Sequence, residues 1–347
     1  MSRYSVGVPD SAQPSGIGPP TTSSIPGYQL ASVTTFVGKS LPPGWVVFSG
    51  QPSGDPGGRW ATNHVTVSNN MLQLNAFQDP RFNNEWVTGG TCECGKPRTY
   101  GAFFVRSRLT GYGPTQVEML WPVAGWPPEV DFEETYGVTT ASQATFHYTT
   151  QNHQIHKNIH INMTAWHTWG VIWTPTSFIY TVDGRVWGSI TDPSIIPHQP
   201  MTLHLQQQTW CSAGFACPKS PQSTQVNWIA EYSSTSPEAQ SVGTFASVSS
   251  ALAPSVQASV RRLSQTIAAN GYSTVTLTGY VDGAASRARA LAVGVGWANS
   301  VKQYLNEQLA SLNVSNVSIN AAGSQSSDAS PTNPSRTETG QVFALLK

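Results

Sequence analysis

The chain has 347 residues, enough for two domains, and it carries 18 basic and 18 acidic side chains, so its formal net charge is zero. This balance excludes the strongly basic surface with which proteins bind nucleic acid or anionic membranes. The chain contains no run of about 18 apolar residues, so the sequence predicts no transmembrane helix. We therefore expect no nucleic-acid partner and no membrane span.

Residues 1–27 are rich in Ser, Pro and Gly and show no periodic pattern of apolar residues, which predicts a flexible leader. The same residues lack the apolar segment of a secretion signal. We consequently expect either an extracellular protein whose signal is not part of this chain, or a component of a phage virion that leaves its host by lysis.

Short strand patterns separated by turn residues run from residue 28 to residue 233, with scarcely a helical stretch among them. Residues 64–75 read as two strands joined by the turn Ser68-Asn69-Asn70, and residues 178–187 read as a hairpin because Asp183-Gly184 favours a tight turn. Many short strands at this spacing predict an all-β sandwich. The strands are expected at 64–67, 71–75, 99–109, 116–121, 129–134, 144–148, 168–174, 178–187, 201–207 and 226–232.

The segment 129–134 reads Glu-Val-Asp-Phe-Glu-Glu, so acidic and apolar side chains alternate along a predicted strand. Glu129, Asp131 and Glu133 would share one face, where like charges repel one another. A solvated acidic edge would carry lysines, but none lies between residues 97 and 156. The segment is therefore a candidate catalytic or ligand-binding row in a chain that is only 10% charged.

Paired carboxylates on one rigid face suit glycoside hydrolysis. One ionised carboxylate attacks the anomeric carbon or stabilises its positive charge, while a second, protonated, gives a proton to the leaving oxygen. A third acid between them separates their pKa values and orients the nucleophile. Close neighbours on one strand give the short separation of a retaining mechanism.

The pattern Glu129-x-Asp131-x-x-Glu134 resembles the β-bulged signature of glycoside hydrolase family 16, the laminarinase and lichenase group. Gly137 stands three positions after Glu134, as is common in that family, and this spacing favours the bulged register over one that ends at Glu133. The resemblance implies Glu129 as the nucleophile, Asp131 as its assistant and Glu134 as the general acid/base. Glu133 is the reserve candidate.

The resemblance extends over residues 28–233, because the segments 98–101, 167–175, 178–187 and 226–228 match further landmarks of the family in the same order. It implies a concanavalin-like jelly roll. The sequence departs from the family at 116–121, where Gln116 and Glu118 replace a pattern that is often aromatic, and this change would alter the sugar subsites.

Aromatic faces are platforms for sugar rings, although most aromatic residues of an all-β domain fill its core. His147 lies on the strand after the acidic one, where it would hydrogen-bond the substrate or the acid/base, or would simply be a structural histidine. We expect the segment with His153, His156 and His160 to be a solvated loop. The candidate substrate-binding residues are Trp126, Trp121, His147, Trp210, Trp86 and Tyr100.

The four cysteines form two short-range pairs, and an even count in a weakly charged chain indicates an oxidising compartment. A disulfide between Cys211 and Cys217 would close a small loop, whereas the spacing of Cys92 and Cys94 is awkward for a disulfide. Cross-pairing of the two loops and a four-thiolate zinc site are the alternatives. Neither pair has C-x2-C spacing, so we expect no metal, and we expect no cofactor.

The composition changes at residues 234–246, where Ser, Thr, Pro and Gly predict a linker. Residues 247–347 then alternate helical and strand patterns, which predicts a smaller α+β domain. Helices are expected at 254–270 and 286–309, and strands at 274–282, 317–321 and 341–346.

This C-terminal region resembles a diverged OmpA-like module. Residues 279–282, Gly-Tyr-Val-Asp, are similar to the end of the family's ligand strand, and Arg336 lies six residues before Val342, as the family's arginine does. The resemblance implies that Asp282 and Arg336 bind peptidoglycan or another envelope glycan. Other ligand positions differ, so the alternative is a packing or assembly domain.

We therefore predict a retaining endo-glycosidase that hydrolyses a β-linked polysaccharide, with β-1,3-glucan as the first candidate and an envelope-associating or assembly domain at its C-terminus. The first alternative is a glycan-binding protein in which the acids hold sugar without cutting it. The second is a structural phage tail protein with virion assembly partners, a role that is compatible with catalysis.

Overall fold

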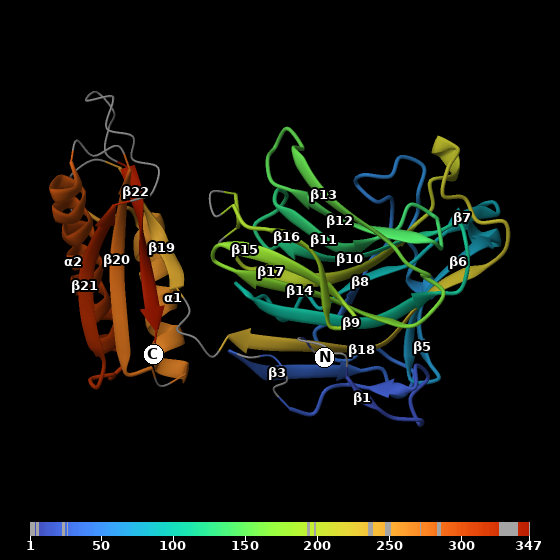
Figure 1. Ribbon diagram of the computed structural model, residues 1–347, viewed down its shortest axis with the longest axis horizontal. Coiled ribbons are helices and arrows are strands. Elements are labelled where there is room, and N and C mark those ends of the chain that lie inside the picture. Colours follow the sequence, from blue (N-terminus) through green and yellow to red (C-terminus); the bar gives the residue numbers. More distant parts are fainter. Residues whose placement is uncertain are drawn as a thin grey trace. The chain divides into compact units, whose positions relative to one another are not determined.

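The computed structural model describes residues 4, 7–22, 25, 27–192, 195–197, 199–234, 239–246, 251–270, 272–282, 286–325 and 339–346. The chain divides into two compact units, Met1–Thr235 and Ser236–Lys347 (Figure 1). Neither described helix combines the length and the apolar character that are needed to cross a membrane. Each unit is described by itself below.

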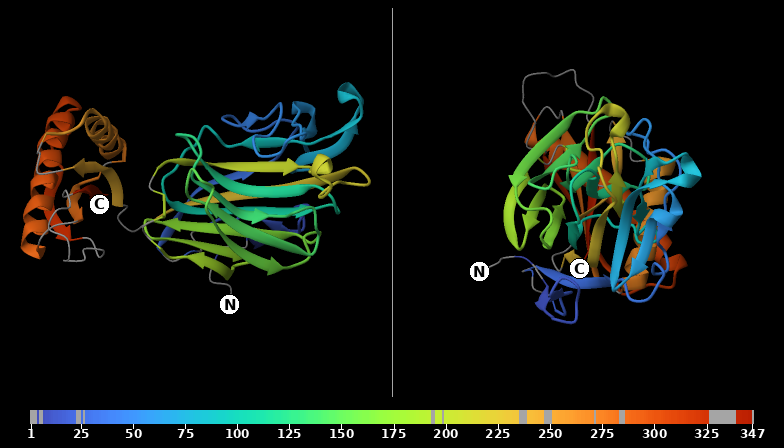
Figure 2. Two further views of the ribbon diagram at one scale, coloured as in Figure 1. Left: turned by 90° about the horizontal axis from the view of Figure 1, so that it is seen from above. Right: turned by 90° about the vertical axis from the view of Figure 1, so that its right-hand side faces the viewer.

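The first unit is a sandwich of two antiparallel sheets that lie face to face (Figures 1 and 2). In the described part of the chain the first sheet has seven strands, in the order β13 (Gln154–His160), β12 (Ala141–His147), β11 (Glu129–Glu134), β10 (Thr115–Pro122), β17 (Met201–Gln208), β8 (Gly90–Cys92) and β4 (Val46–Val47). This sheet carries the acidic strand.

The second sheet has nine strands among the described residues, and its central strand β18 pairs with three others. The order is β16 (Arg185–Ile190), β15 (Ser177–Val182), β14 (His167–Thr174), β9 (Gly101–Leu109), β18 (Gln222–Ser234), β6 (Met71–Asp79) and β5 (Val65–Ser68), with β3 (Tyr28–Thr35) paired to β18 and β7 (Glu85–Val87) paired to β6. Short 3-10 helices lie at Thr62–His64, Pro80–Phe82 and Cys211–Ala213.

The core lies between the sheets because alternate residues of each strand point to the same side. Val130 and Phe132 of β11 are fully buried there, together with Leu120 of β10 and Trp169 and Trp173 of β14. Burial of each such side chain stabilises the fold by about 1.5–3 kcal/mol. Since β11 has its apolar residues on this side, Glu129 and Asp131 face outward.

The hairpins at 65–79 and 177–190 form as predicted. Asn69 and Asn70 have φ values of 53° and 57°, and Asp183 and Gly184 have 46° and 74°. Positive φ at both central residues is the geometry of the tight turn that matches the twist of paired strands. The segment after residue 153 differs from the prediction, because His156 and His160 lie on strand β13 and not in a loop.

Part of the leader that we expected to be flexible is a hairpin, β1 (Val8–Pro9) and β2 (Ile17–Gly18). It is fixed to the second sheet by long-range hydrogen bonds: Ser15 Oγ donates to Asn227 Oδ1 at 2.7 Å, and the indole nitrogen of Trp228 donates to the Ile17 carbonyl at 2.9 Å. The sequence lacks a local signal for this arrangement because its partners lie more than 200 residues away.

The second unit has two helices, α1 (Pro254–Asn270) and α2 (Arg287–Ser311), among its described residues. They pack on one face of a four-stranded sheet with the order β19 (Ala239–Ala246), β22 (Thr339–Leu346), β20 (Thr274–Asp282) and β21 (Ser318–Gln325). β20 and β21 are parallel, and the other pairs are antiparallel. The α+β prediction agrees with this arrangement, but the predicted linker does not, since β19 occupies residues 239–246.

A close approach explains two glycines of the second unit. A Cβ atom added to Gly279 on β20 would lie 2.3 Å from the carbonyl oxygen of Gly294 on α2. No side chain tolerates that distance, so the helix reaches the sheet only because both positions are glycine. Ser286 begins α2 by accepting a hydrogen bond from the Arg289 amide at 3.2 Å, as an N-cap does.

Candidate active site

A β-bulge in β11 brings the acids together. Glu133 pairs with Glu118 of β10 and Asp131 pairs with Met119, so Phe132 is an extra residue without a partner on β10. The bulge returns Glu134 to the face of Glu129 and Asp131, whereas Glu133 points between the sheets and is fully buried. The structure therefore has the bulged register that the position of Gly137 favoured, and the reserve residue Glu133 is not on the site face.

Glu129 is held by Trp126, which precedes it by three residues. The indole nitrogen donates to Glu129 Oε2 at 2.9 Å. The same indole packs edge-on against the His147 ring, with 6.4 Å between the ring centroids. Trp126 is 37% exposed, so its ring is accessible while its nitrogen orients the carboxylate. Burial raises the pKa of Glu129.

Asp131 forms an ion pair with His147, whose Nε2 atom lies 3.3 Å from Asp131 Oδ2. On the other side of the ring, Nδ1 lies 2.6 Å from Asn152 Oδ1 and donates to it. Burial by itself would lower the pKa of His147, but the hydrogen bond and charge of Asp131 outweigh it and raise this pKa to about 9. Burial and the charge of Glu129 raise the pKa of Asp131. Glu129, Asp131 and His147 therefore titrate as one group.

Glu134 is fixed by three donors on its Oε2 atom. Thr145 Oγ1 donates at 2.8 Å, the Tyr136 hydroxyl at 3.1 Å and Gln143 Nε2 at 3.3 Å. Thr145 is also the cross-strand partner of Asp131, so the Glu134 carboxylate leans toward the other two acids. Glu129 and Glu134 are both partly exposed, which leaves two carboxylates accessible on one face.

The site face continues across β10 and β17. Asp131, Met119 and His204 occupy one row, because each pairs with the next in register. The His204 ring stacks on Trp121 with 6.0 Å between centroids, and burial lowers its pKa to about 4. We did not predict His204, although alternate positions of the predicted strand 201–207 carry Thr, His and Gln and so mark a polar face.

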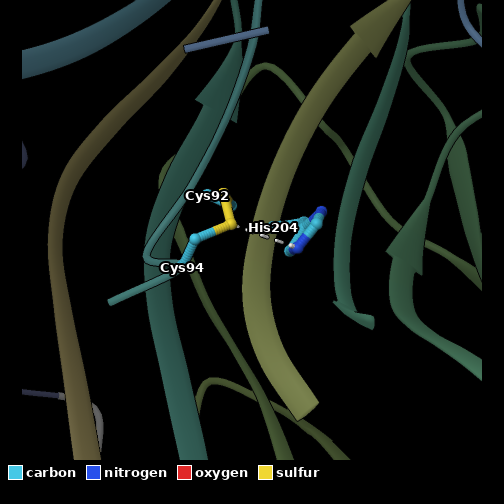
Figure 3. Close-up of side chains that lie close together, drawn as sticks. All are labelled: Cys92, Cys94 and His204. Carbon is cyan, nitrogen blue, oxygen red and sulfur yellow. Dashed lines mark hydrogen bonds between the residues drawn. A yellow bond between two sulfur atoms is a disulfide. The ribbon is translucent and has the colours of Figure 1, made fainter. Parts of the chain in front are cut away.

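A disulfide lies at the far end of this row (Figure 3). Cys92 and Cys94 are bonded to each other with 5.0 Å between their Cα atoms, despite the short spacing, and Cys94 Sγ lies 3.9 Å from His204 Nε2. Both sulfur atoms are therefore engaged with each other and are not thiolate ligands. The alternatives of cross-pairing and a four-thiolate zinc site do not describe this structure.

The second disulfide, Cys211–Cys217, has 4.6 Å between its Cα atoms and closes the loop that follows Trp210. Trp210 stacks on Phe215, with 5.4 Å between centroids. A Cβ atom on Gly137 would lie 2.5 Å from Cα of Ala216, so this loop sits against the turn that follows Glu134. Trp210 thus precedes a loop that contacts the turn after Glu134, and its role as a substrate-binding residue stays a prediction.

Other predicted residues lie elsewhere. Tyr100 is wrong as a substrate-binding residue: it is 4% exposed and packs in the core, edge-on against Trp173 at 5.2 Å. Trp86 lies on the short strand β7, beside β6 of the second sheet, and no described contact joins it to the acids. In the second unit Asp282 ends β20, but its side chain and all of Arg336 lie outside the described residues.

The arrangement is suited to nucleophilic and acid–base chemistry. It offers an oriented carboxylate at Glu129, a second carboxylate at Glu134, and Asp131 between them on the same face. Oxygen and nitrogen atoms of Glu129, Asp131 and His147 also lie within 4.8 Å of one another. The ion pair between Asp131 and His147 occupies the facing atoms, so we do not assign these residues to a metal.

Solved structures similar to this one share the sandwich. The catalytic domain of an endo-1,3-beta-glucanase (laminarinase) from Thermotoga petrophila RKU-1 is 17% identical, with 60% of this chain and 98% of that chain covered and a TM-score of 0.52. An endo-beta-1,3-glucanase from Pyrococcus furiosus is 18% identical, with coverages of 60% and 95% and a TM-score of 0.51. A laminarinase from Rhodothermus marinus is 19% identical, with coverages of 59% and 97% and a TM-score of 0.52.

At these identities the likeness establishes the fold alone. A search of curated proteins found no match. The family model for glycosyl hydrolases family 16, in contrast, matches residues 56–230, which is half of the chain and includes every acid of the site. The chain belongs to glycosyl hydrolases family 16.

Proposed function

We propose that the chain is a retaining endo-glycosidase that hydrolyses a β-1,3-glucan. The observation that carries the proposal is the bulge at Phe132, which places the carboxylates of Glu129 and Glu134 on one accessible face with Asp131 between them. The family supports a glycoside hydrolase. Similar structures include a laminarinase catalytic domain and an endo-β-1,3-glucanase, which favours β-1,3-glucan as the substrate class.

In the first step Glu134 gives its proton to the glycosidic oxygen while a carboxylate oxygen of Glu129 attacks the anomeric carbon. The bond between that carbon and the leaving oxygen breaks, and a covalent glycosyl–Glu129 ester forms. In the second step Glu134 takes a proton from water, whose oxygen attacks the anomeric carbon and releases Glu129. Two inversions retain the configuration of that carbon.

Neighbouring groups assist both steps. The Trp126 indole holds Glu129 in a fixed orientation, which lowers the cost of reaching the attacking geometry. Asp131 orients the nucleophile Glu129. Because protonated His147 pairs with Asp131, the negative charge beside Glu129 is partly compensated. The exposed ring of Trp126 and the half-buried ring of Trp121 would serve as platforms for sugar units next to the cleaved bond.

Release of reducing ends from a panel of β-1,3-, mixed-linkage β-1,3/1,4- and β-1,4-glucans and of galactans tests the proposal. We expect cleavage of the β-1,3-glucans, with loss of at least about 1,000-fold in Glu129→Gln and in Glu134→Gln. Proton NMR of the first anomer that appears reports retention or inversion. Binding of a glycan without any product from wild-type protein would instead support the glycan-binding alternative.

We further propose that the second unit is a diverged OmpA-like module that holds the enzyme near an envelope glycan. The residue pattern at 279–282 and the placement of two helices on one face of a mixed sheet support this role. An extracellular or virion-borne enzyme would act at such an envelope. Co-sedimentation with purified peptidoglycan tests it: we expect binding by the intact chain and loss of binding in Asp282→Ala and Arg336→Ala, whereas binding unchanged in both would favour an assembly domain.

A further inference from the structure

Two carboxyl groups lie inside the sandwich, directly behind the site face. Glu118 of β10 and Glu133 of β11 are cross-strand partners that are 1% and 0% exposed, so Glu118 does not line a sugar subsite, contrary to the expectation from the sequence. Their described hydrogen-bond partners are neutral: Ser107, Gln116 and Ser142. Two buried carboxylates facing each other without a cation would repel strongly, so the pair keeps at least one proton.

Burial and hydrogen bonds act in opposite directions on the pKa of each acid. Glu118 Oε1 accepts from Ser107 Oγ and from Gln116 Nε2, the latter at 3.2 Å. Donors stabilise a charged carboxylate, so these bonds favour the ionised form of Glu118. Burial nevertheless raises the pKa of Glu118 to about 8. Burial, followed by the proximity of Glu118, raises the pKa of Glu133 well above its ordinary range.

Ser142 of β12 gives an independent argument from geometry. Its Oγ atom lies 3.1 Å from the Glu134 nitrogen, 3.0 Å from the Glu134 carbonyl oxygen and 3.0 Å from Glu133 Oε1. A hydroxyl group has one proton and two acceptor sites. The Glu134 N–H donates to the Ser142 hydroxyl oxygen. The Ser142 hydroxyl donates its single proton to the Glu134 carbonyl, because a carbonyl oxygen can only accept.

The remaining acceptor site of Ser142 faces Glu133 Oε1. Only a protonated Glu133, which donates, satisfies all three contacts at the same time. An ionised Glu133 would compete with the Glu134 carbonyl for the one hydroxyl proton and would weaken the contact between Ser142 and that carbonyl. Buried polar groups rarely lack a partner, because an unsatisfied group costs about 1–3 kcal/mol.

We propose that Glu133 is a neutral carboxylic acid that positions Glu134: it donates a hydrogen bond to Ser142, and Ser142 holds both backbone groups of Glu134. Glu133 is thus a positioning residue that acts through Ser142. The role rests on the proposed function of Glu134 as the acid/base. It also explains how a strand can carry an acid on its buried side, since the acid has a neutral form with a defined partner.

Two substitutions separate the hydrogen bond from packing. Glu133→Gln keeps a neutral donor of the same shape, whereas Glu133→Met keeps the length and removes the donor. Ser142→Ala removes the linking hydroxyl. We expect Glu133→Gln to retain kcat within about 3-fold, and Glu133→Met and Ser142→Ala to lose about 10- to 100-fold in kcat with little change in KM, because small displacements of a catalytic group are costly.

Glu118→Gln is the matched control, since Glu118 is equally buried but does not contact Ser142 in the described hydrogen bonds. We expect Glu118→Gln to keep kcat within about 3-fold. The proposal is overturned if Glu133→Gln is as slow as Glu133→Met, or if all variants match the wild type. Thermal unfolding of each variant shows whether a loss reflects the site or a failure to fold.

Infrared spectroscopy tests the protonation of Glu133 without any substrate, which distinguishes this inference from the proposed function. A neutral carboxyl group has a carbonyl stretch that an ionised one lacks. We expect that band in the wild type at neutral pH to be larger than in Glu133→Gln. If wild-type protein cleaved no glycan but showed this difference, the proposed function would fail and the neutral acid would stand; an unchanged band would disprove it.

Discussion

The indole nitrogen of Trp126 donates to Glu129 at 2.9 Å, and the two residues are only three positions apart in the chain. The ring that offers a sugar platform therefore also fixes the proposed nucleophile. A substrate unit that moved this ring would also move the carboxylate. Substrate contact and the orientation of the nucleophile are coupled through one side chain.

Trp126→Phe keeps an aromatic face and removes the donor. Hydrogen bonds to charged groups contribute about 1.5–3 kcal/mol, so we expect kcat to fall by about 10- to 100-fold while KM changes little. Initial rates on a β-1,3-glucan measure both constants. Trp166→Phe is the control, because Trp166 contacts Arg108 and not the acids. A raised KM with unchanged kcat would show that Trp126 serves only as a platform.

His147→Gln tests the ion pair with Asp131. The pKa of His147 is raised to about 9 in the folded protein, compared with about 6.5 when unfolded. The pairing therefore stabilises the fold fully below about pH 6.5, and this contribution is lost as the pH rises through about 9. We expect the wild type to unfold at a higher temperature than His147→Gln near pH 6 and the difference to shrink near pH 10. A difference that is constant with pH would contradict the pairing.

Glu133→Gln tests the pKa of the buried carboxyl group through the pH dependence of stability. The folded pKa of Glu133 lies above its ordinary value of 4.5, so the stability that its neutral form contributes is complete below that pH and declines as the pH rises toward the folded pKa. The glutamine has no such dependence. We expect the unfolding temperature of Glu133→Gln to gain on that of the wild type as the pH rises above about 4.5. Parallel curves would show that Glu133 ionises normally.

The sequence predicted the features that depend on local spacing. The alternation in residues 129–134 predicted a strand with acids on one face, and Asn69-Asn70 and Asp183-Gly184 predicted hairpin turns. The bulge was implied by the family resemblance together with Gly137. These patterns are local because side-chain direction in a strand repeats every two residues. Such patterns do not indicate which strand will pair with which in the sheet.

The features that the sequence did not predict depend on that missing register. His204 joins the site only because β17 pairs with β10, and Ser142 reaches Glu133 only because β12 pairs with β11. Tyr100 was misassigned for a related reason. The sequence around an aromatic residue at a strand end does not indicate whether its side chain faces the core or the solvent. The leader hairpin depends on Asn227, far along the chain.

The disulfide Cys211–Cys217 closes the loop beside the turn after Glu134. In the chain-entropy account a loop of this size stabilises the fold by about 2 kcal/mol. We expect the double variant Cys211→Ser with Cys217→Ser to unfold at a lower temperature and to raise KM for long glucans, because Trp210 loses its fixed position. Cys92→Ser with Cys94→Ser is the comparison. Equal KM values in both variants and the wild type would exclude a role of the Trp210 loop in binding.

Gly279→Ala tests whether the two units are independent. The added Cβ atom would lie 2.3 Å from the Gly294 carbonyl oxygen, which belongs to the backbone of α2 and cannot rotate away. We expect the second unit to lose several kcal/mol of stability, since the helix must move off its sheet. Glucan hydrolysis should be unchanged, because every acid of the site belongs to the first unit. Gly296→Ala is the matched control, because a Cβ atom added to Gly296 has no other atom within 4 Å. Calorimetry of the whole chain separates the two transitions, and a loss of activity in Gly279→Ala alone would show that the first unit needs the second to function.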